Sequence, residues 1–186
     1  MYFGRRQFRE AISLLERAIA IDPDMAESHH NLGNALVQTG DALRARASFA
    51  EAIRLRPEVA AFHMSLASLF ARQGELTQAK YHLECAVRAG VPRDQPNREL
   101  EISDRHAILA TLLLRMGDKR SAIREYQSAI AAYPMLYEAH LKLGELLIAE
   151  GHIATAREHL SLAAQSPNTA LRAAAEKLLA AIAPAK

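Results

Sequence analysis

The sequence has few features of a secreted, membrane-spanning or disulfide-stabilised protein. Its one cysteine, Cys85, excludes a disulfide within the chain. No apolar run approaches the roughly 18 to 20 residues that span a bilayer. The first residues, MYFGRRQFREA, lack the apolar core and cleavage site of a signal peptide. We therefore expect no membrane insertion and a cytoplasmic location.

An excess of charge of one sign is also missing. The 23 basic and 21 acidic residues leave a net charge of +2 and are spread along the whole chain. Without a basic block the chain has nothing to follow a nucleic-acid backbone, so we expect no nucleic-acid partner. A hydrophobic content of 50% with 24% charged residues is typical of a soluble, folded protein.

Motifs that carry catalysis or hold a cofactor are absent as well. The sequence contains no glycine-rich phosphate loop, no serine-centred elbow and no paired-cysteine metal spacing. Cys85 has no recognisable activating partner, so we expect a partly buried and inert thiol. We predict no catalytic residues, no enzymatic activity, no cofactor and no metal.

What the sequence does contain is a repeat. One alanine recurs as Ala11, Ala45, Ala79, Ala122 and Ala156, at spacings of 34, 34, 43 and 34 residues. A second small residue follows each seven positions later, with a bulky apolar residue between the two. The second small residues are Ala18, Ala52, Ala86, Ala129 and Ala163, and the bulky ones are Leu15, Phe49, Leu83, Tyr126 and Leu160.

Further columns frame this pattern. A turn glycine precedes four of the first alanines, as Gly40, Gly74, Gly117 and Gly151. Upstream lies a column of Leu32-Gly33, Leu66-Ala67, Leu109-Ala110 and Leu143-Gly144. These spacings place the apolar residues on helical stripes. Small residues such as Gly33 and Ala45 would let two antiparallel helices approach closely, while Phe49 fills the space beside them.

These columns resemble the tetratricopeptide repeat family, whose pattern combines a bulky residue, Leu-Gly, a further bulky residue, Ala, Phe and a terminal Pro. The resemblance covers nearly the whole chain and implies an all-α fold, a right-handed α-solenoid (superhelix) of antiparallel helix pairs. The repeats look most similar to those of bacterial proteins and of O-linked N-acetylglucosamine transferases, because residues 26–36 resemble their asparagine-bearing helix. The asparagine ladder of those enzymes does not continue, since Ser65, Ile108 and Lys142 replace Asn31 in the later repeats.

The alignment predicts one array over residues 1–186. At the level of helices we expect a solitary helix at about 7–21, hairpins at about 25–56, 59–90, 98–133 and 136–166, and a final helix. The repeat boundaries are a partial repeat at 1–23, repeats at 24–57, 58–91, 103–134 and 135–167, an inserted loop at 91–102, and a C-terminal capping helix at 168–183. The acidic residues Asp41, Glu75 and Asp118, which follow turn glycines, fit helix starts.

Histidine occupies one equivalent position in the four complete repeats, as His29, His63, His106 and His140. Neighbouring helices lie about 8–10 Å apart, whereas the ligands of one zinc ion lie about 2 Å from the metal. One histidine per hairpin therefore cannot converge on a single ion, and we interpret this column as packing. His152 and His159 are expected on the surface.

The candidate site is the face that stacking leaves open. The resemblance implies that first-helix residues opposite the Leu-Gly stripe line the inner face of the superhelix and bind a peptide. They are Glu27, His30, Asn31, Asn34, Gln38, Met64, Ser65, Ser68, Arg72, Ile108, Thr111, Arg115, Leu141, Lys142 and Glu145. Amide side chains such as Asn31 could pair with a peptide main chain, and Arg72, Arg115 and Lys142 could receive carboxylates. The alternative is a merely solvated face.

Two functions follow from these patterns. The first is a non-enzymatic scaffold or adaptor that binds a peptide or protein segment in its concave groove. The second is a substrate-recognition or assembly region of a larger enzyme with such repeats, for example a bacterial transferase.

The first repeat raises a separate question. Apolar residues of the first helix, such as Leu15 and Ile19, lack the mate of a complete hairpin. We therefore predict self-association through this helix, either as a symmetric homodimer or end to end, and favour the dimer because it closes.

Overall fold

The structure is a computed structural model that describes residues 2–182, and the side chains of residues 7–182. Its helices are α1 (Tyr2–Ile21), α2 (Ala26–Thr39), α3 (Ala42–Leu55), α4 (Ala60–Gln73), α5 (Leu76–Arg88), α6 (Arg98–Arg115), α7 (Lys119–Ala132), α8 (Tyr137–Ala149), α9 (Ile153–Ala163) and α10 (Thr169–Ala181). No strand occurs within these residues, so the predicted all-α class is confirmed. None of the helices in this part combines the length and the apolarity needed to cross a membrane.

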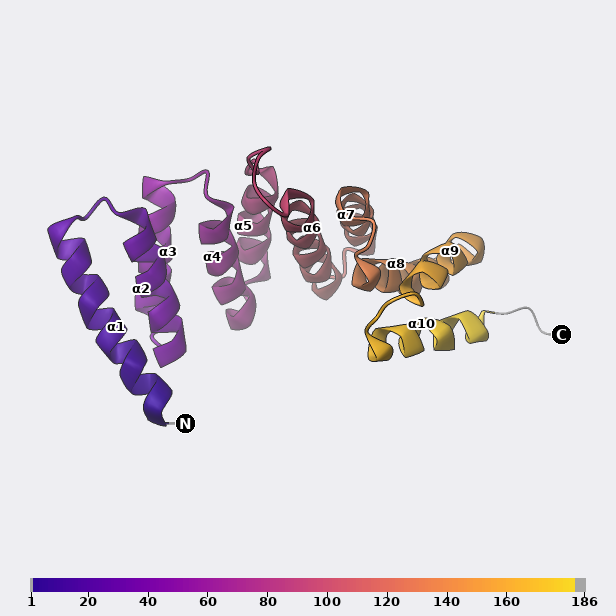
Figure 1. Cartoon of the computed structure of the whole chain (residues 1–186), viewed down its shortest axis with the longest axis horizontal. Coiled ribbons are helices and arrows are strands. Elements are labelled where there is room, and N and C mark those ends of the chain that lie inside the picture. The colour runs from indigo at the N-terminus through magenta and orange to yellow at the C-terminus, as the bar shows by residue number, and fades with distance from the viewer. Residues whose placement is uncertain (1, 183–186) are drawn as a thin grey trace. The chain divides into compact units, whose positions relative to one another are not determined.

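The chain divides into two compact units, Met1–Gly90 and Val91–Lys186. In the first unit, α1 packs on α2, and the hairpins α2–α3 and α4–α5 follow one another (Figure 1). The second unit contains the hairpins α6–α7 and α8–α9 and the final helix α10. Each hairpin joins a first helix and a second helix through a tight turn.

The hairpin turns depend on backbone that only glycine adopts easily. Gly40 ends α2 with φ of 89°, and the other three predicted turn glycines have φ between 81° and 83°. This left-handed conformation carries the amide of Asp41 back to the Leu36 carbonyl at 3.0 Å, which closes the helix end. All four glycines therefore lie at hairpin turns, as the sequence predicted.

The residue after each glycine is the N-cap of the second helix. The carboxylates of Asp41 and Asp118 accept hydrogen bonds from the amides of Arg44 and Ser121, as N-caps do. Glu75 makes no such cap, although the same role was predicted for it. Its longer side chain instead lies 3.6 Å from the Arg46 guanidinium.

Within a hairpin the two helices touch where small residues oppose bulky ones. A Cβ added at Gly33 would lie 2.5 Å from the Phe49 ring, and one added at Gly144 would lie 2.7 Å from Leu160. The two alanine columns of the second helices are fully buried in all four complete repeats. The predicted close approach of the helices is therefore present.

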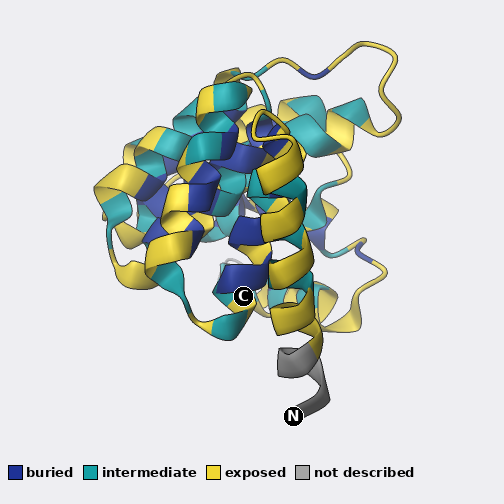
Figure 2. Cartoon of the chain, turned by 90° about the vertical axis from the view of Figure 1, so that its left-hand side faces the viewer, coloured by how far each residue is buried: buried dark blue, intermediate teal, exposed yellow. Residues whose placement is uncertain are grey.

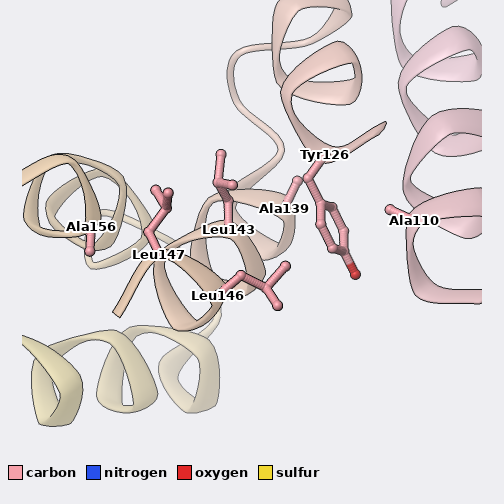
Figure 3. Packing of buried hydrophobic residues seen from close by; sticks show 7 residues of the cluster. All are labelled: Ala110, Tyr126, Ala139, Leu143, Leu146, Leu147 and Ala156. Carbon is pink, nitrogen blue, oxygen red and sulfur yellow. The ribbon is translucent and has the colours of Figure 1, made fainter. Parts of the chain in front are cut away.

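The second unit shows how a hairpin is joined to its successor. Tyr126 points from α7 into the space between Ala110 of α6 and Ala139 of α8 (Figure 3). Leu143 and Leu147 of α8 extend the same buried cluster towards Ala156 of α9. In this unit, α7 is thus covered on one side by its own first helix α6 and on the other by the next first helix α8.

The final helix covers the last hairpin. The side chain of Asn168 accepts hydrogen bonds from the amides of Ala170 and Leu171 and begins α10. Ala175 is fully buried, and the neighbouring apolar residues of α10 pack against α8 and α9. The predicted cap at 168–183 is observed as Thr169–Ala181, and residue 183 lies outside the described residues.

One helix start and one loop boundary differ from the sequence prediction. α1 begins at Tyr2 rather than near residue 7. α6 begins at Arg98, where the hairpin expected at about 98–133 starts, so the last five residues of the loop predicted at 91–102 are helical. Asn97, with φ of 59°, turns the chain into this extended helix.

Candidate protein-binding face

The first unit presents polar side chains on its two first helices. Asn31, Asn34 and Gln38 of α2 are exposed, as are Ser68 and Arg72 of α4. The opposite side of α2 carries the buried Leu-Gly stripe, which holds the helix in place and leaves these residues facing solvent. α2 and α4 are in contact, so the structure brings both sets together. We call this set the unit 1 face.

A hydrogen-bond network joins the two helices beneath this face. The Asn34 amide nitrogen lies 3.3 Å from Nε2 of His30, and the Ser65 hydroxyl lies 2.9 Å from the same nitrogen. Since an amide nitrogen only donates, Nε2 accepts from both groups. The His30 ring also packs against the Phe62 ring, tilted by 37° with 4.8 Å between the centroids, and its burial lowers the pKa of His30.

Two predicted contact residues are therefore engaged inside the protein. His30 and Ser65 bind each other and fix α2 against α4, because this position of the first helix points towards the next first helix. Met64 is only partly exposed. Asn34 keeps its carbonyl oxygen for another partner, since only its amide nitrogen is used.

The two predicted charged residues of the first unit, Glu27 and Arg72, differ in whether another side chain of the protein pairs with them. Glu27 pairs with Arg56, which follows α3. Arg72 is exposed, and no carboxylate among the described residues pairs with it. Arg72 is therefore a cation available to an outside carboxylate.

Several predicted residues of the second unit contact other side chains of the protein. Ile108 and Arg115 are exposed on α6. The Thr111 hydroxyl lies 3.1 Å from the Tyr126 hydroxyl. This contact was not predicted from the sequence. The signal for it was a tyrosine in a column that otherwise holds Phe and Leu. Nζ of Lys142 lies 3.0 Å from a carboxylate oxygen of Glu145.

Leu141 does not belong to any open face. It is 7% exposed and packs with Leu160, Ala163 and Ala175. Its position is equivalent to that of His30, which points towards the following first helix, and α10 takes the place of that helix here. The prediction of Leu141 as a contact residue was therefore wrong.

In three of the four complete repeats, the histidine of the column holds the hairpin to the proline before it. Nε2 of His29, His63 and His140 lies 2.9 to 3.1 Å from the carbonyl oxygen of Pro23, Pro57 and Pro134 respectively. A carbonyl only accepts, so each Nε2 carries the proton and Nδ1 is left as an acceptor. In two hairpins a second histidine donates to it, at 3.1 Å for His63–His82 and 2.9 Å for His140–His159.

His159 was expected on the surface, but it is half-buried because its Nδ1 meets His140. In the third complete repeat, Nδ1 of His106 lies 2.8 Å from Glu125 instead. Cys85 is partly buried, and the Arg88 guanidinium donates to its sulfur at 3.2 Å. Among the described side chains, no three His, Cys, Asp or Glu residues are grouped to hold a metal ion.

Comparison with known proteins gives the family. A family model described as Tetratricopeptide repeat matches residues 30–90 and 109–185, and one described as TPR repeat matches residues 1–40. The TPR repeat-containing thioredoxin TTL4 of Arabidopsis thaliana is 33% identical over 123 residues. This match covers 66% of the chain but 18% of that protein, so the chain spans about a fifth of this relative's length.

Solved structures share the fold. MamA is 22% identical with a TM-score of 0.71, and the match covers 88% of this chain and 93% of that one. YrrB, described as a TPR protein with an unusual peptide-binding site, is 21% identical with a TM-score of 0.68, covering 88% and 82%. PilF of Pseudomonas aeruginosa is 18% identical with a TM-score of 0.71, covering 100% and 88%. From its repeat columns, its helix pairs and these matches, the chain belongs to the tetratricopeptide repeat family.

Proposed function

We propose that the chain is a non-enzymatic scaffold that binds a peptide or protein segment on the unit 1 face. The observation that carries this proposal is the set of exposed polar groups on α2 and α4 that the protein itself leaves unused. Asn31, Gln38, Ser68 and Arg72 are exposed, while the residues beneath them are fixed by the His30–Ser65 contact. Exposed groups on a rigid support are what a binding surface requires.

The chemistry of the face fits an extended segment with an acidic group. Amide side chains donate and accept, so Asn31 and Gln38 can pair with the carbonyls and amides of a main chain. Arg72 can hold a carboxylate through two parallel hydrogen bonds. We therefore propose a segment that places an acidic side chain or a free C-terminus beside Arg72.

A second candidate is that the chain serves as the recognition region of a larger enzyme. The match to a TPR repeat-containing thioredoxin over 18% of its length favours this candidate, because there the matched repeats are a small part of a longer protein. The unit 1 face would have the same task in both cases. The reaction would then lie outside the residues described.

The test uses a partner captured from cells of the source organism. Mass spectrometry would identify the partner, and overlapping peptides would map its bound segment. We expect Arg72→Glu to weaken binding of that peptide by about tenfold or more, and Asn31→Ala to weaken it less. Titration calorimetry would measure both, and both variants should keep the melting temperature because the two side chains are exposed.

Arg124→Glu is the matched control, since it reverses the same charge at an exposed position of the second helix α7. Its affinity should equal that of the unchanged protein. Equal affinity of Arg72→Glu and Asn31→Ala to the unchanged protein would show that the partner binds elsewhere.

A further inference from the structure

α1 carries the same columns as the second helices but is much less covered. In α3, α5, α7 and α9 the two alanines and the bulky residue between them are 0 to 4% exposed. The equivalent Ala11, Leu15 and Ala18 of α1 are only partly buried. No described side chain of α1 is fully buried, and Figure 2 shows this helix in yellow and teal above the N-terminal mark. Among the described residues, no first helix covers this side of α1.

Position 14 shows which side of α1 is exposed. The residues equivalent to Leu14 are Ser48, His82, Glu125 and His159. Three of them contact the histidine of their own first helix, as in the pair His63–His82. Leu14 itself is 62% exposed, and Ile21, two turns further on the same side, is 85% exposed. The open side of α1 is therefore the side that a first helix covers in a complete hairpin.

The open side has a symmetric arrangement of residues. Phe8, Ala11, Leu14, Leu15, Ala18 and Ile21 are spaced evenly about a point between Leu14 and Leu15. A two-fold axis through this point would oppose the small Ala11 with Ala18 of a second copy, and Phe8 with its Ile21. Small residues opposite each other let two helices approach closely. We propose that α1 pairs antiparallel with α1 of a second copy of the chain, forming a two-fold dimer across this stripe.

The charges of α1 also favour a second copy of this helix in the antiparallel direction. Residues 1–10 carry a net charge of +2, and residues 13–24 carry one of −2. The described helix has no acidic residue in its first turn and no basic residue in its last, so its charges oppose its own dipole. An antiparallel copy places the acidic end of one helix beside the basic end of the other. A parallel copy would place like charges together.

Light scattering at high micromolar concentration tests the dimer. We expect twice the mass of one chain, and we expect Leu14→Glu to raise the dissociation constant by about two orders of magnitude. Leu43→Glu is the matched control, because Leu43 is a leucine of α3 that is 83% exposed and lies outside the stripe. The control should remain dimeric. A monomeric unchanged protein, or a Leu14→Glu variant that is still dimeric, would overturn the proposal.

Disulfide trapping tests the direction of the helices. In a Cys85→Ser background, chains with Phe8→Cys mixed with chains with Ile21→Cys should cross-link on mild oxidation. Chains with Ile21→Cys alone should not, because the axis separates the two copies of this residue by about 20 Å along the helix. Cross-linking of Ile21→Cys with itself and not with Phe8→Cys would indicate parallel helices and overturn the antiparallel pairing.

Discussion

Gly33 and Phe49 set how closely the helices of the hairpin α2–α3 approach. The other hairpins carry equivalent pairs, Ala67 with Leu83, Ala110 with Tyr126 and Gly144 with Leu160. At Gly33 an added Cβ would lie 2.5 Å from the aromatic ring, which is inside the contact distance of two carbon atoms. The ring and the helix cannot both stay in place if this position gains a side chain.

We expect Gly33→Ala to lower the free energy of unfolding by about 1–3 kcal/mol, the usual cost of overpacking a core. The penalty should be smaller in a Phe49→Leu background, because the smaller side chain leaves room for the new methyl group. Denaturant unfolding of the two single variants and the double variant measures the coupling.

Gly90→Ala is the control, since an added Cβ there meets nothing within 4 Å. It should leave the free energy of unfolding unchanged or slightly higher. Equal penalties for Gly33→Ala in both backgrounds would mean that Phe49 is not the residue that excludes a side chain.

For single residues, the sequence predicted which side chains are buried better than it predicted which ones are exposed on the binding face. The alanine and Leu-Gly columns recur at a fixed period, so their burial follows from the pattern alone. Leu141 shares a first-helix position with His30, and its burial depends on α10, which lies about 30 residues further along the chain. The exposure of such a residue depends on which helix packs beside it. The repeat pattern does not contain that information.

A buried histidine pair connects the two helices of the hairpin α4–α5. Nδ1 of His82 donates to Nδ1 of His63, and Nε2 of His63 donates to the Pro57 carbonyl, so the ring of His63 is neutral in the folded hairpin. Burial, with the nearby His63, lowers the pKa of His82 to about 4. Burial also lowers the pKa of His63, and Arg88 adds to this effect. In the hairpin α8–α9, burial lowers the pKa of His159 in the same way, although Glu158 raises it in part.

These shifts predict that acid destabilises the hairpins. An unfolded histidine has a pKa of about 6.5. Below that pH the unfolded chain binds protons that the folded hairpin does not, so stability is full above about pH 6.5 and falls as the pH drops towards 4. We expect the melting temperature to decline between pH 7 and pH 5, and to decline less in His82→Ser, which copies the natural Ser48.

His152→Ser is the control, because His152 is exposed. It should decline with pH as the unchanged protein does. If His82→Ser shows the same decline as His152→Ser, the pair does not cause the acid sensitivity.

The helices themselves were predictable, because the turn glycines and the apolar spacing mark both ends of most of them. The exception is the start of α1, which lies at Tyr2 instead of near residue 7. The start of α6 at Arg98 agrees with the hairpin expected at about 98–133, although the loop predicted at 91–102 extends past it. That start depends on Asn97, whose left-handed conformation is uncommon for a residue other than glycine.

The segment at the start of the second unit, just after the boundary between the two units, is the most open part of the chain between α1 and α10. Residues 92–97 are all exposed, and the inserted residues break the 34-residue period at this point. The units on either side have buried clusters of their own, around Phe62 in the first and Leu143 in the second. We therefore expect each unit to keep its helices when the chain is cut in this segment.

We expect limited trypsin digestion to make its first internal cut after Arg93, because exposed loop backbone fits a protease and helical backbone does not. Two fragments, ending and beginning near this residue, should accumulate and remain helical by circular dichroism. Arg93→Gln should slow their appearance. Early cleavage within α3 or α7 instead would show that the hairpins open more readily than the loop.

The four hairpin glycines have a consequence for stereochemistry. Their backbone lies in the region that an L-residue avoids and its mirror image would prefer, with φ between 81° and 89°. An added Cβ at any of them meets nothing within 4 Å, so space is not what reserves these positions. The bends require a residue without handedness, and a substitution there would strain the backbone while touching no other atom.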